Sequence, residues 1–336
     1  MKGTENHGDQ SSKDKLEELF RHASARERPP AASEQSVRQA LHAEWTGLSR
    51  HRRRRRRLVA WAAAASVLLT VLIVWSQVQG PQSPGPAMQL AAVEKVMGTV
   101  LVQSSGAPAT QTLEISGRLE TGQQIVSAAG SRVAIRWLNG ESIRMDEHSK
   151  LQLNSATGIT LLAGRIYLDT AGVKPGAELI IMTPAGRVRH LGTRYMTSVS
   201  AQGTTVSVRD GRVLLEAGGK ETVTGRGQQL TVSTSGTHTL DRISTYGSLW
   251  KWTEELAPIF SLDGRSMADF LDWVARETGR VVEFSSPQAE KLAHDTLLRG
   301  QLELEPIRAL TVVLQTSDLI SEVSAGTIVV GLLAQD

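Results

Sequence analysis

The segment RVAIRWLNGESIRM, Arg132–Met145, decides the fold class of the larger part of the chain. Apolar residues alternate with polar ones from Val133 to Trp137, which is the two-residue period of a strand with one buried face. Asn139-Gly140 interrupts this pattern, and a second short strand follows up to Met145. Because Asn-Gly favours positive φ at both central positions of a turn, we expect a type I′ hairpin.

The same pattern continues on both sides of this hairpin. A second hairpin is predicted from Val206 to Leu215, with Asp210-Gly211 as its turn. Shorter strand signals occur at Ala92–Val102, Gly158–Leu168, Leu179–Thr183, Tyr195–Val199 and Gln229–Val232. Many short strands with glycine-rich turns predict an all-β sandwich, roll or solenoid over residues 92–235.

Helical periodicity returns after a predicted linker, residues 236–257. A strand at Phe260–Leu262 precedes a helix with Met267, Phe270, Leu271 and Val274 on one face, and Gly279 ends that helix. The later elements are predicted as strands Val281–Phe284 and Thr296–Leu302, a helix opened by Pro306, and the hairpin strands Asp318–Val323 and Thr327–Leu332. Residues 258–336 are therefore expected to form a small α+β module, with Thr327–Val330 as a candidate edge strand for β-augmentation by a partner.

An uncharged apolar run of 21 residues, Leu58–Val78, precedes the β-rich region. As an α-helix it would span roughly 31 Å, close to the ~30 Å hydrocarbon thickness of a bilayer. Trp61 and Trp75 lie near its ends, where indole rings favour the headgroup boundary. A cleaved signal peptide would have a shorter apolar run and a small-residue cleavage site. The run therefore predicts an uncleaved transmembrane helix, followed by a Pro/Gly-rich linker over residues 79–91.

Six arginines stand directly before this run, namely Arg52, Arg53, Arg54, Arg55, Arg56 and Arg57. Juxtamembrane arginines are retained on the cytoplasmic side, so residues 1–57 are expected in the cytoplasm and residues from about 79 onward outside it. Residues 1–57 carry net charge +6 and residues 58–336 carry −3, so the basic character belongs to the N-terminal segment. A nucleic-acid patch is the competing interpretation, but the position of the arginines beside an apolar run favours topology.

The predicted cytoplasmic segment contains short amphipathic patterns. In one of them Val37, Leu41, Trp45 and Leu48 lie on one side of a helix. Such a stripe either packs within a small helical hairpin or lies in a groove on a partner protein, and the scarcity of core residues favours the partner.

Catalytic and metal-binding patterns are missing from the sequence. The chain has no cysteine, and its eight histidines are scattered without HExxH spacing. Asp146-Glu147-His148 is interpreted as a solvated turn, because adjacent strand residues alternate faces and cannot converge on a metal. We therefore expect no enzyme activity, no metal and no cofactor.

The segment TPAGRVRHLGTRYMTSV, Thr183–Val199, resembles the FecR family. The residues that carry this resemblance are Thr183, Pro184, Gly186, Leu191, Gly192 and Thr193. Further along the chain, SLDGRSMADFLDWVARETG, Ser261–Gly279, resembles the secretin/TonB short N-terminal domain that is often joined to this family.

The resemblance implies a single-pass inner-membrane regulator of an extracytoplasmic-function sigma factor in Gram-negative bacteria. The cytoplasmic tail would bind the sigma factor, and the periplasmic part would receive a signal from a TonB-dependent outer-membrane receptor, with a link to iron transport. The alternative is an envelope scaffold, or a glycan- or protein-binding module with a membrane anchor.

Overall fold

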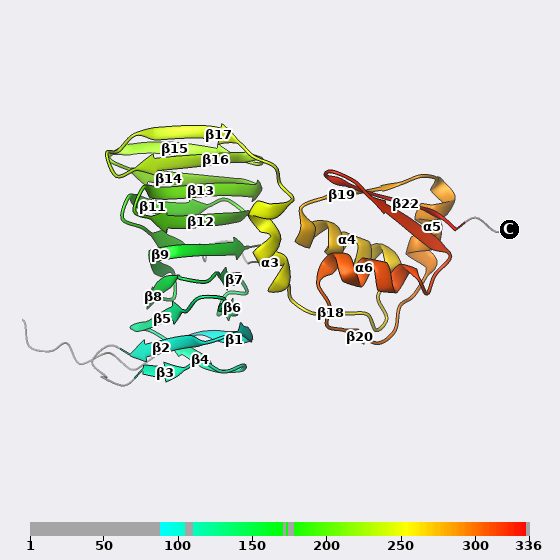
Figure 1. Cartoon of the computed structure of the whole chain (residues 1–336), viewed down its shortest axis with the longest axis horizontal. Helices are drawn as coiled ribbons and strands as arrows, with labels where there is room; N and C mark the ends of the chain where they lie inside the picture. Colours follow the sequence, from blue (N-terminus) through cyan, green and yellow to red (C-terminus); the bar gives the residue numbers. More distant parts are fainter. Residues whose placement is uncertain (1–87, 105–109, 171–172, 174–177, 334–336) are drawn as a thin grey trace, which may run out of the picture. The chain divides into compact units, whose positions relative to one another are not determined.

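The computed structural model describes residues 88–104, 110–170, 173 and 178–333 (Figure 1). Every described residue lies in one compact unit, Pro84–Asp336. The predicted cytoplasmic segment, the predicted transmembrane helix at 58–78 and most of the predicted linker at 79–91 lie outside the described residues. Within the described residues, no helix has the length and apolar character needed to cross a membrane.

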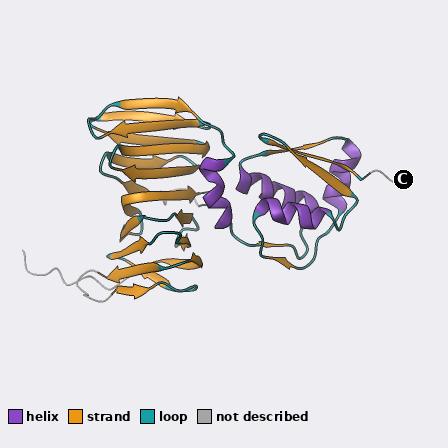
Figure 2. Ribbon diagram, in the orientation of Figure 1, coloured by secondary structure: helices purple, strands orange, loops and turns teal. Residues whose placement is uncertain are grey.

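Two β-sheets form the larger part of the described chain (Figure 2). Sheet A contains, in spatial order, β4 (Arg118–Glu120), β1 (Gln89–Met97), β6 (Arg132–Trp137), β7 (Ser142–Met145), β9 (Gly158–Asp169), β12 (Arg194–Ser200), β13 (Gly203–Asp210), β16 (Gln228–Ser233) and β17 (His238–Arg242). Sheet B contains β3 (Thr110–Thr112), β2 (Val100–Ser104), β5 (Gln123–Ser127), β8 (Lys150–Ser155), the first half of β9, β10 (Ile180–Met182), β11 (Gly186–His190), β14 (Arg212–Ala217) and β15 (Lys220–Gly225). The prediction of a β-domain is confirmed, and its strands extend from residue 89 to residue 242.

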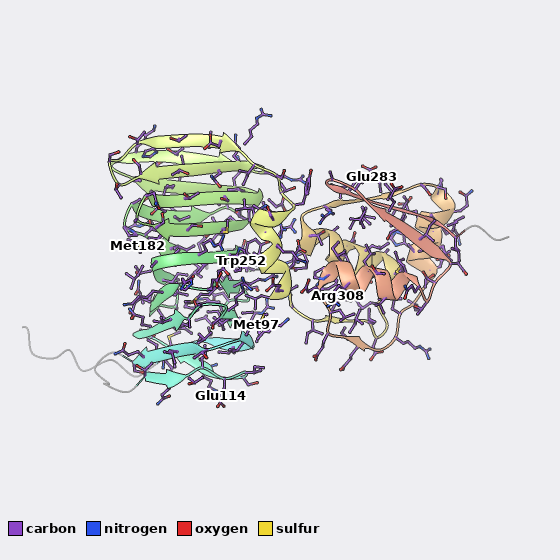
Figure 3. All side chains as sticks on the ribbon, viewed as in Figure 1. Met97, Glu114, Met182, Trp252, Glu283 and Arg308 are labelled. Atoms are coloured by element: carbon purple, nitrogen blue, oxygen red, sulfur yellow. The ribbon has the colours of Figure 1, made fainter. Side chains whose placement is uncertain are left out.

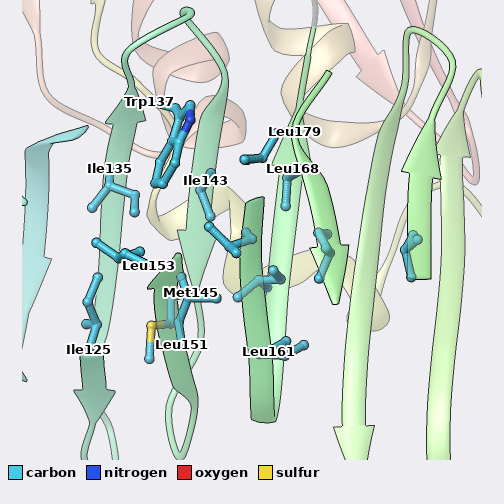
Figure 4. Close-up of a cluster of buried hydrophobic side chains, with 14 of the residues drawn as sticks. Ile125, Ile135, Trp137, Ile143, Met145, Leu151, Leu153, Leu161, Leu168 and Leu179 are labelled. Atoms are coloured by element: carbon cyan, nitrogen blue, oxygen red, sulfur yellow. The ribbon is translucent and has the colours of Figure 1, made fainter. Parts of the chain in front are cut away.

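The hydrophobic core lies between the two sheets, as the close-up in Figure 4 shows. Alternate residues of each strand, such as Ile135, Ile143 and Leu168 of sheet A, point inward and are fully buried. Trp137 fills one end of the core, and its indole nitrogen donates to the carbonyl oxygen of Ala156 at 2.8 Å. Each fully buried Ile or Leu side chain stabilises the fold by about 1.5–3 kcal/mol relative to an exposed one.

The first predicted hairpin is present as β6 and β7, but its turn is not type I′. Gly140 has a positive φ of 100°, whereas Asn139 does not. Gly140 donates to the carbonyl of Trp137 at 2.9 Å, and Trp137 donates to the carbonyl of Glu141 at 2.8 Å. This is a three-residue loop in which only the last residue is left-handed, an arrangement that lets β7 re-enter the ladder through a bulge.

The second predicted hairpin is wrong. β13 pairs with β12 and β16 in sheet A, whereas β14 pairs with β11 and β15 in sheet B. The chain changes sheets at Gly211, where φ is 77° and an added Cβ would overlap the carbonyl oxygen of Gly192. Strand alternation and a glycine turn look the same in sequence whether the chain folds back within a sheet or crosses to the opposite one.

Residues 236–257 are not a linker. They contain β17, a 3-10 turn at Ser248–Trp250 and helix α3 (Lys251–Glu255). Trp250 and Trp252 are buried against Ala134, Tyr167 and Met196 on the outer face of sheet A (Figure 3, which labels Trp252). Two large aromatic side chains need apolar cover, and this face supplies it.

The C-terminal part is a small α+β module, as predicted. Its helices are α4 (Met267–Thr278), α5 (Pro287–Asp295) and α6 (Pro306–Leu314), and its strands are β18 (Phe260–Ser261), β19 (Val281–Phe284), β20 (Gln301–Leu302), β21 (Leu319–Val323) and β22 (Thr327–Leu332). Ser266 begins α4 with a reciprocal capping box to Asp269, and Gly279 ends it in the left-handed conformation.

Two expectations for this module are wrong. The predicted strand at Thr296–Leu302 is reduced to β20 and one isolated bridge at Leu297, and helix α5 before it was not predicted. Ser286 caps α5 and Pro287 begins it, but the helix buries only Ala289 and Ala293, so its apolar periodicity is weak. β22 lies between β19 and β21 and is therefore not an edge strand, which removes Thr327–Val330 as a site for β-augmentation.

Candidate functional site

Charged side chains that the sequence suggests are solvated lie buried where the outer face of sheet A meets helices α3 and α4. We call this cluster the ionic joint. It consists of five buried residues, Arg144, Asp169, Arg209, Glu254 and Glu277, and of Arg276, whose side chain is exposed at the rim. Arg144 and Arg209 are the largest charged residues that are fully buried in the described part of the chain.

Arg144 extends from β7 to both helices. Its Nη2 atom lies 2.7 Å from a carboxylate oxygen of Glu277 on α4, and its Nη1 atom donates to the carbonyl of Thr253 on α3 at 2.7 Å. The guanidinium also lies over the ring of Tyr167, 5.2 Å from its centroid. Core residues Ile143 and Met145 flank Arg144 and point the other way, so the strand period directs this side chain outward.

Arg209 lies at an irregularity of β13. Arg194 pairs with Asp210 while Tyr195 pairs with Val208, so Arg209 is the extra residue of a β-bulge. Bulges re-aim side chains, and this one directs the guanidinium over the ring of Trp250 at 4.9 Å. Its Nη1 atom donates to the carbonyl of Glu277 at 2.9 Å.

The C-terminal end of α4 is held almost entirely by the β-domain and the segment that follows it. Besides the carbonyl of Glu277, the carbonyl of Arg276 accepts from Arg194 at 2.6 Å, and the carbonyl of Gly279 accepts from Thr245 at 2.9 Å. The last carbonyls of a helix have no partner within it and carry partial negative charge. Arginine donors from sheet A satisfy both requirements, which fixes the position of this helix end.

A second ion pair lies beside the first. Two guanidinium nitrogens of Arg276 contact one carboxylate oxygen of Asp169 at 2.5 and 3.0 Å, and Asp169 is almost fully buried at the end of β9. The joint therefore alternates basic and acidic groups from the sheet and the helix, with no excess of one sign at the contact.

Burial and charge act in opposite directions on the joint. Burial by itself lowers the pKa of Arg144, but the carboxylate of Glu277 offsets this and raises the pKa above its ordinary value. Arg276 follows the same pattern, with Asp169 as the compensating charge. Burial raises the pKa of Glu254, and the nearby cations Lys251 and Arg209 only reduce the effect. Such a joint is strongly destabilised when one partner is removed, because the other stays buried and uncompensated.

The predicted motif residues lie elsewhere, at turns and corners of the β-domain. Thr183 donates through its hydroxyl to the carbonyl of Gly186 at 2.9 Å and closes the turn, containing Pro184, between β10 and β11. Leu191, Gly192 and Thr193 form the corner where the chain passes from sheet B to sheet A.

This corner has its own hydrogen-bond network. The Thr193 hydroxyl donates to the carbonyl of Arg212 at 2.6 Å, and the Thr193 amide donates to the hydroxyl of Thr170 at 2.7 Å. The carbonyl oxygen of Gly192 lies against Gly211, which forms the corner between β13 and β14. The motif therefore locks two successive sheet crossings together. The predicted sigma-factor contacts Val37, Leu41, Trp45 and Leu48, and the arginines Arg52 to Arg57, lie outside the described residues and stay predictions.

The interpretation of Asp146-Glu147-His148 as a solvated turn is wrong for its first residue. Asp146 is fully buried and forms ion pairs with Arg132, at 2.8 Å, and with Arg165. Glu147 accepts from the amide of Gly130 at 2.7 Å, and His148 takes a left-handed conformation at a sheet crossing. Across the described ranges, no three His, Cys, Asp or Glu side chains are grouped so that they could hold a metal ion.

No periodicity predicts the ionic joint. Its members are spread from residue 144 to residue 277, and only Arg144 stands between two apolar residues in the sequence. The sequence signal is weak: Arg144 and Arg209 lie within strand patterns, and a segment with two tryptophans, Leu249–Trp252, occurs 40 positions after Arg209.

Comparison with known proteins gives one domain match. Residues 123–214 match the family model described as "FecR protein". Two crystal structures of a "putative anti-sigma factor" from Parabacteroides distasonis ATCC 8503 are similar, each with 14% sequence identity and a TM-score of 0.34. They cover 63% and 62% of this chain, and 99% and 97% of their own. No curated protein matches. The matched range contains the motif and three members of the ionic joint, Arg144, Asp169 and Arg209, so the chain contains a FecR domain.

Proposed function

We propose that this protein regulates an extracytoplasmic-function sigma factor from the inner membrane, in response to a signal received outside the cytoplasm. The observation that carries the proposal is the FecR domain at residues 123–214. The arginines before the apolar run at 58–78 support a cytoplasmic N-terminus and a periplasmic C-terminal part.

The ionic joint supports a role for the C-terminal module in reception. Helix α4 of that module ends on sheet A of the FecR domain, so a partner that displaces α4 changes the partners of Arg144 and Arg209. In this proposal a TonB-dependent outer-membrane receptor contacts the C-terminal module, and the change at α4 passes through the FecR domain toward the membrane. Buried ion pairs can serve this role, because each charge has a specific partner and separating one partner leaves the other buried and uncompensated.

The deciding experiment is a capture assay with the tail, residues 1–57, as bait. We expect it to retain a small sigma factor, and Trp45→Asp to abolish retention because the apolar stripe is interrupted. Gln39→Asp is the matched control, since residue 39 lies on the opposite side of the same helical pattern. If the intact tail retains no sigma factor and deletion of the gene changes no transcript, the proposal is wrong and an envelope scaffold becomes the better interpretation.

Topology is tested separately with a reporter enzyme that is active only outside the cytoplasm. A fusion after residue 87 should be active, and a fusion before Arg52 should be inactive. The reverse result would contradict the proposed orientation.

A further inference from the structure

An inter-sheet slot opens at one end of the FecR-type sandwich, where β12 turns into β13 and β14 turns into β15. Its volume is about 550 Å³, within the roughly 300–1,000 Å³ typical of small-molecule sites. Pro184 and Ala185, from the turn closed by Thr183, line one wall. None of the residues that line the slot belongs to the ionic joint.

The slot exists because one level of the sandwich is built from small residues. On sheet B, Gly186 pairs with Ala217. On sheet A, Thr204 pairs with both Val199 and Val232 at the facing level. An extra side chain on Gly186 would meet the backbone of Glu216. The slot-lining alanine, Ala217, therefore leaves open the space that a Leu or Ile fills elsewhere in this core.

The hydroxyl of Thr204 is a buried polar group without a partner. Thr204 alternates with the core residues Val206 and Val208, so its side chain points between the sheets. The residue is fully buried, and its Oγ1 atom forms no hydrogen bond within the described part of the chain. An unsatisfied buried hydroxyl costs about 1–3 kcal/mol. A ligand that displaces the side chains covering Thr204 and offers it a matching polar group would recover this free energy.

The outermost strands place one cation, Lys220, and one imidazole ring, His238, at the edge of the slot. Lys220 pairs with Ala217, and His238 pairs with Val232, so both lie at the same level on the two facing sheets. His238 also contacts the hydroxyl of Thr222 across the gap at 3.2 Å, which closes this side of the slot. No Asp or Glu lines the slot, and Lys220 forms no ion pair with any described residue.

These features specify the chemistry of the occupant. The cationic end fits a carboxylate. Thr204 is on β13 and His238 is on the edge strand β17, with β16 between them. At the usual strand spacing the two residues are therefore about 10 Å apart. The ligand therefore needs a second hydrogen-bonding group at that distance, and only small apolar groups fit beside Ala217 and Val232. We propose that the inter-sheet slot binds the C-terminal end of a short peptide with small side chains. A purely aliphatic carboxylate fits less well, because it would leave the Thr204 hydroxyl unsatisfied.

The test uses the purified full-length chain and calorimetric titration with three probes. Tri-alanine should bind saturably at one site. Tri-alanine amide, which lacks the carboxylate, should bind at least tenfold more weakly, as expected for loss of charge-assisted hydrogen bonds. Hexanoate, which has the carboxylate without amide groups, should bind about fivefold more weakly than tri-alanine or worse.

Variants locate the site. Lys220→Gln and Thr204→Val should each weaken tri-alanine binding about fivefold or more. Lys150→Gln, on an exposed lysine of β8 away from the slot, should bind normally. Thr204→Val preserves side-chain shape and removes only the unpaired hydroxyl, so thermal unfolding should show an intact fold. Absence of saturable binding by the unchanged protein, equal binding of the amide, equal binding of hexanoate, or the same affinity in the Lys220 variant each overturns the proposal.

Discussion

Replacing Arg144 with methionine isolates the energetics of the ionic joint. Arg144 is fully buried and Glu277 is 3% exposed, so solvent does not screen their contact at 2.7 Å. Arg144→Met leaves the Glu277 carboxylate buried and uncompensated, which costs roughly 3–5 kcal/mol. The carbonyl of Thr253 loses one donor but keeps the amide of Leu256, so it adds little. We expect the free energy of unfolding to fall by about 4 kcal/mol.

The double variant Arg144→Met/Glu277→Leu gives the decisive comparison. Because both charges are removed, it should recover at least about 2 kcal/mol relative to the single variant. Urea unfolding followed by tryptophan fluorescence measures both, since Trp250 and Trp252 lie at the joint. Lys291→Met is the control, because its pair with Asp295 is 79% and 61% exposed and should contribute no more than about 1 kcal/mol. A loss below about 1 kcal/mol for Arg144→Met, or a double variant no more stable than the single one, would refute the reasoning.

Three further predictions concern separate parts of the chain. Burial raises the pKa of Glu141, so the free energy of unfolding should fall as the pH rises above about 4.3, the pKa of this carboxyl in the unfolded chain. In thermal unfolding, Glu141→Gln should be more stable than the unchanged protein at pH 7 and equal to it near pH 4. Gly211→Ala should lower the free energy of unfolding by at least about 2 kcal/mol more than Gly130→Ala. Both glycines have positive φ, but only at residue 211 would the added Cβ overlap a carbonyl oxygen, that of Gly192. Similar losses for the two variants would contradict the corner geometry. Arg194→Met should increase amide hydrogen exchange at the end of α4, since the carbonyl of Arg276 loses its donor, and unchanged exchange would show that this contact does not hold the helix.

The elements of the fold could largely be predicted from local pattern. Alternation at Val133–Trp137 and helical spacing from Met267 to Val274 identified a strand and a helix that the structure contains. The prediction failed where two structures share one pattern. Asp210-Gly211 fits a hairpin and a sheet crossing equally well, and only the pairing of β14 with β11 separates them. Helix α5 was missed because it buries two alanines, which give little apolar signal.

The candidate site could not be predicted because burial of a charge is a property of neighbours. Arg144 stands between Ile143 and Met145, as an outward-facing arginine of a solvated strand would, and its partner Glu277 lies 133 positions away in sequence. The segment expected to be a linker supplies the cover, through Trp250 and Trp252.

Local sequence pattern is enough to predict a β-domain followed by an α+β module, because side-chain period and glycine turns act over a few residues. The sequence also carries the FecR motif, whose Thr193 hydroxyl and Gly192 lie where two successive sheet crossings touch. Only the tertiary structure decided which strands pair, which arginines are buried and where a slot stays open. Those outcomes depend on contacts between distant residues, and the free energy of each charge is set by the groups that folding brings beside it.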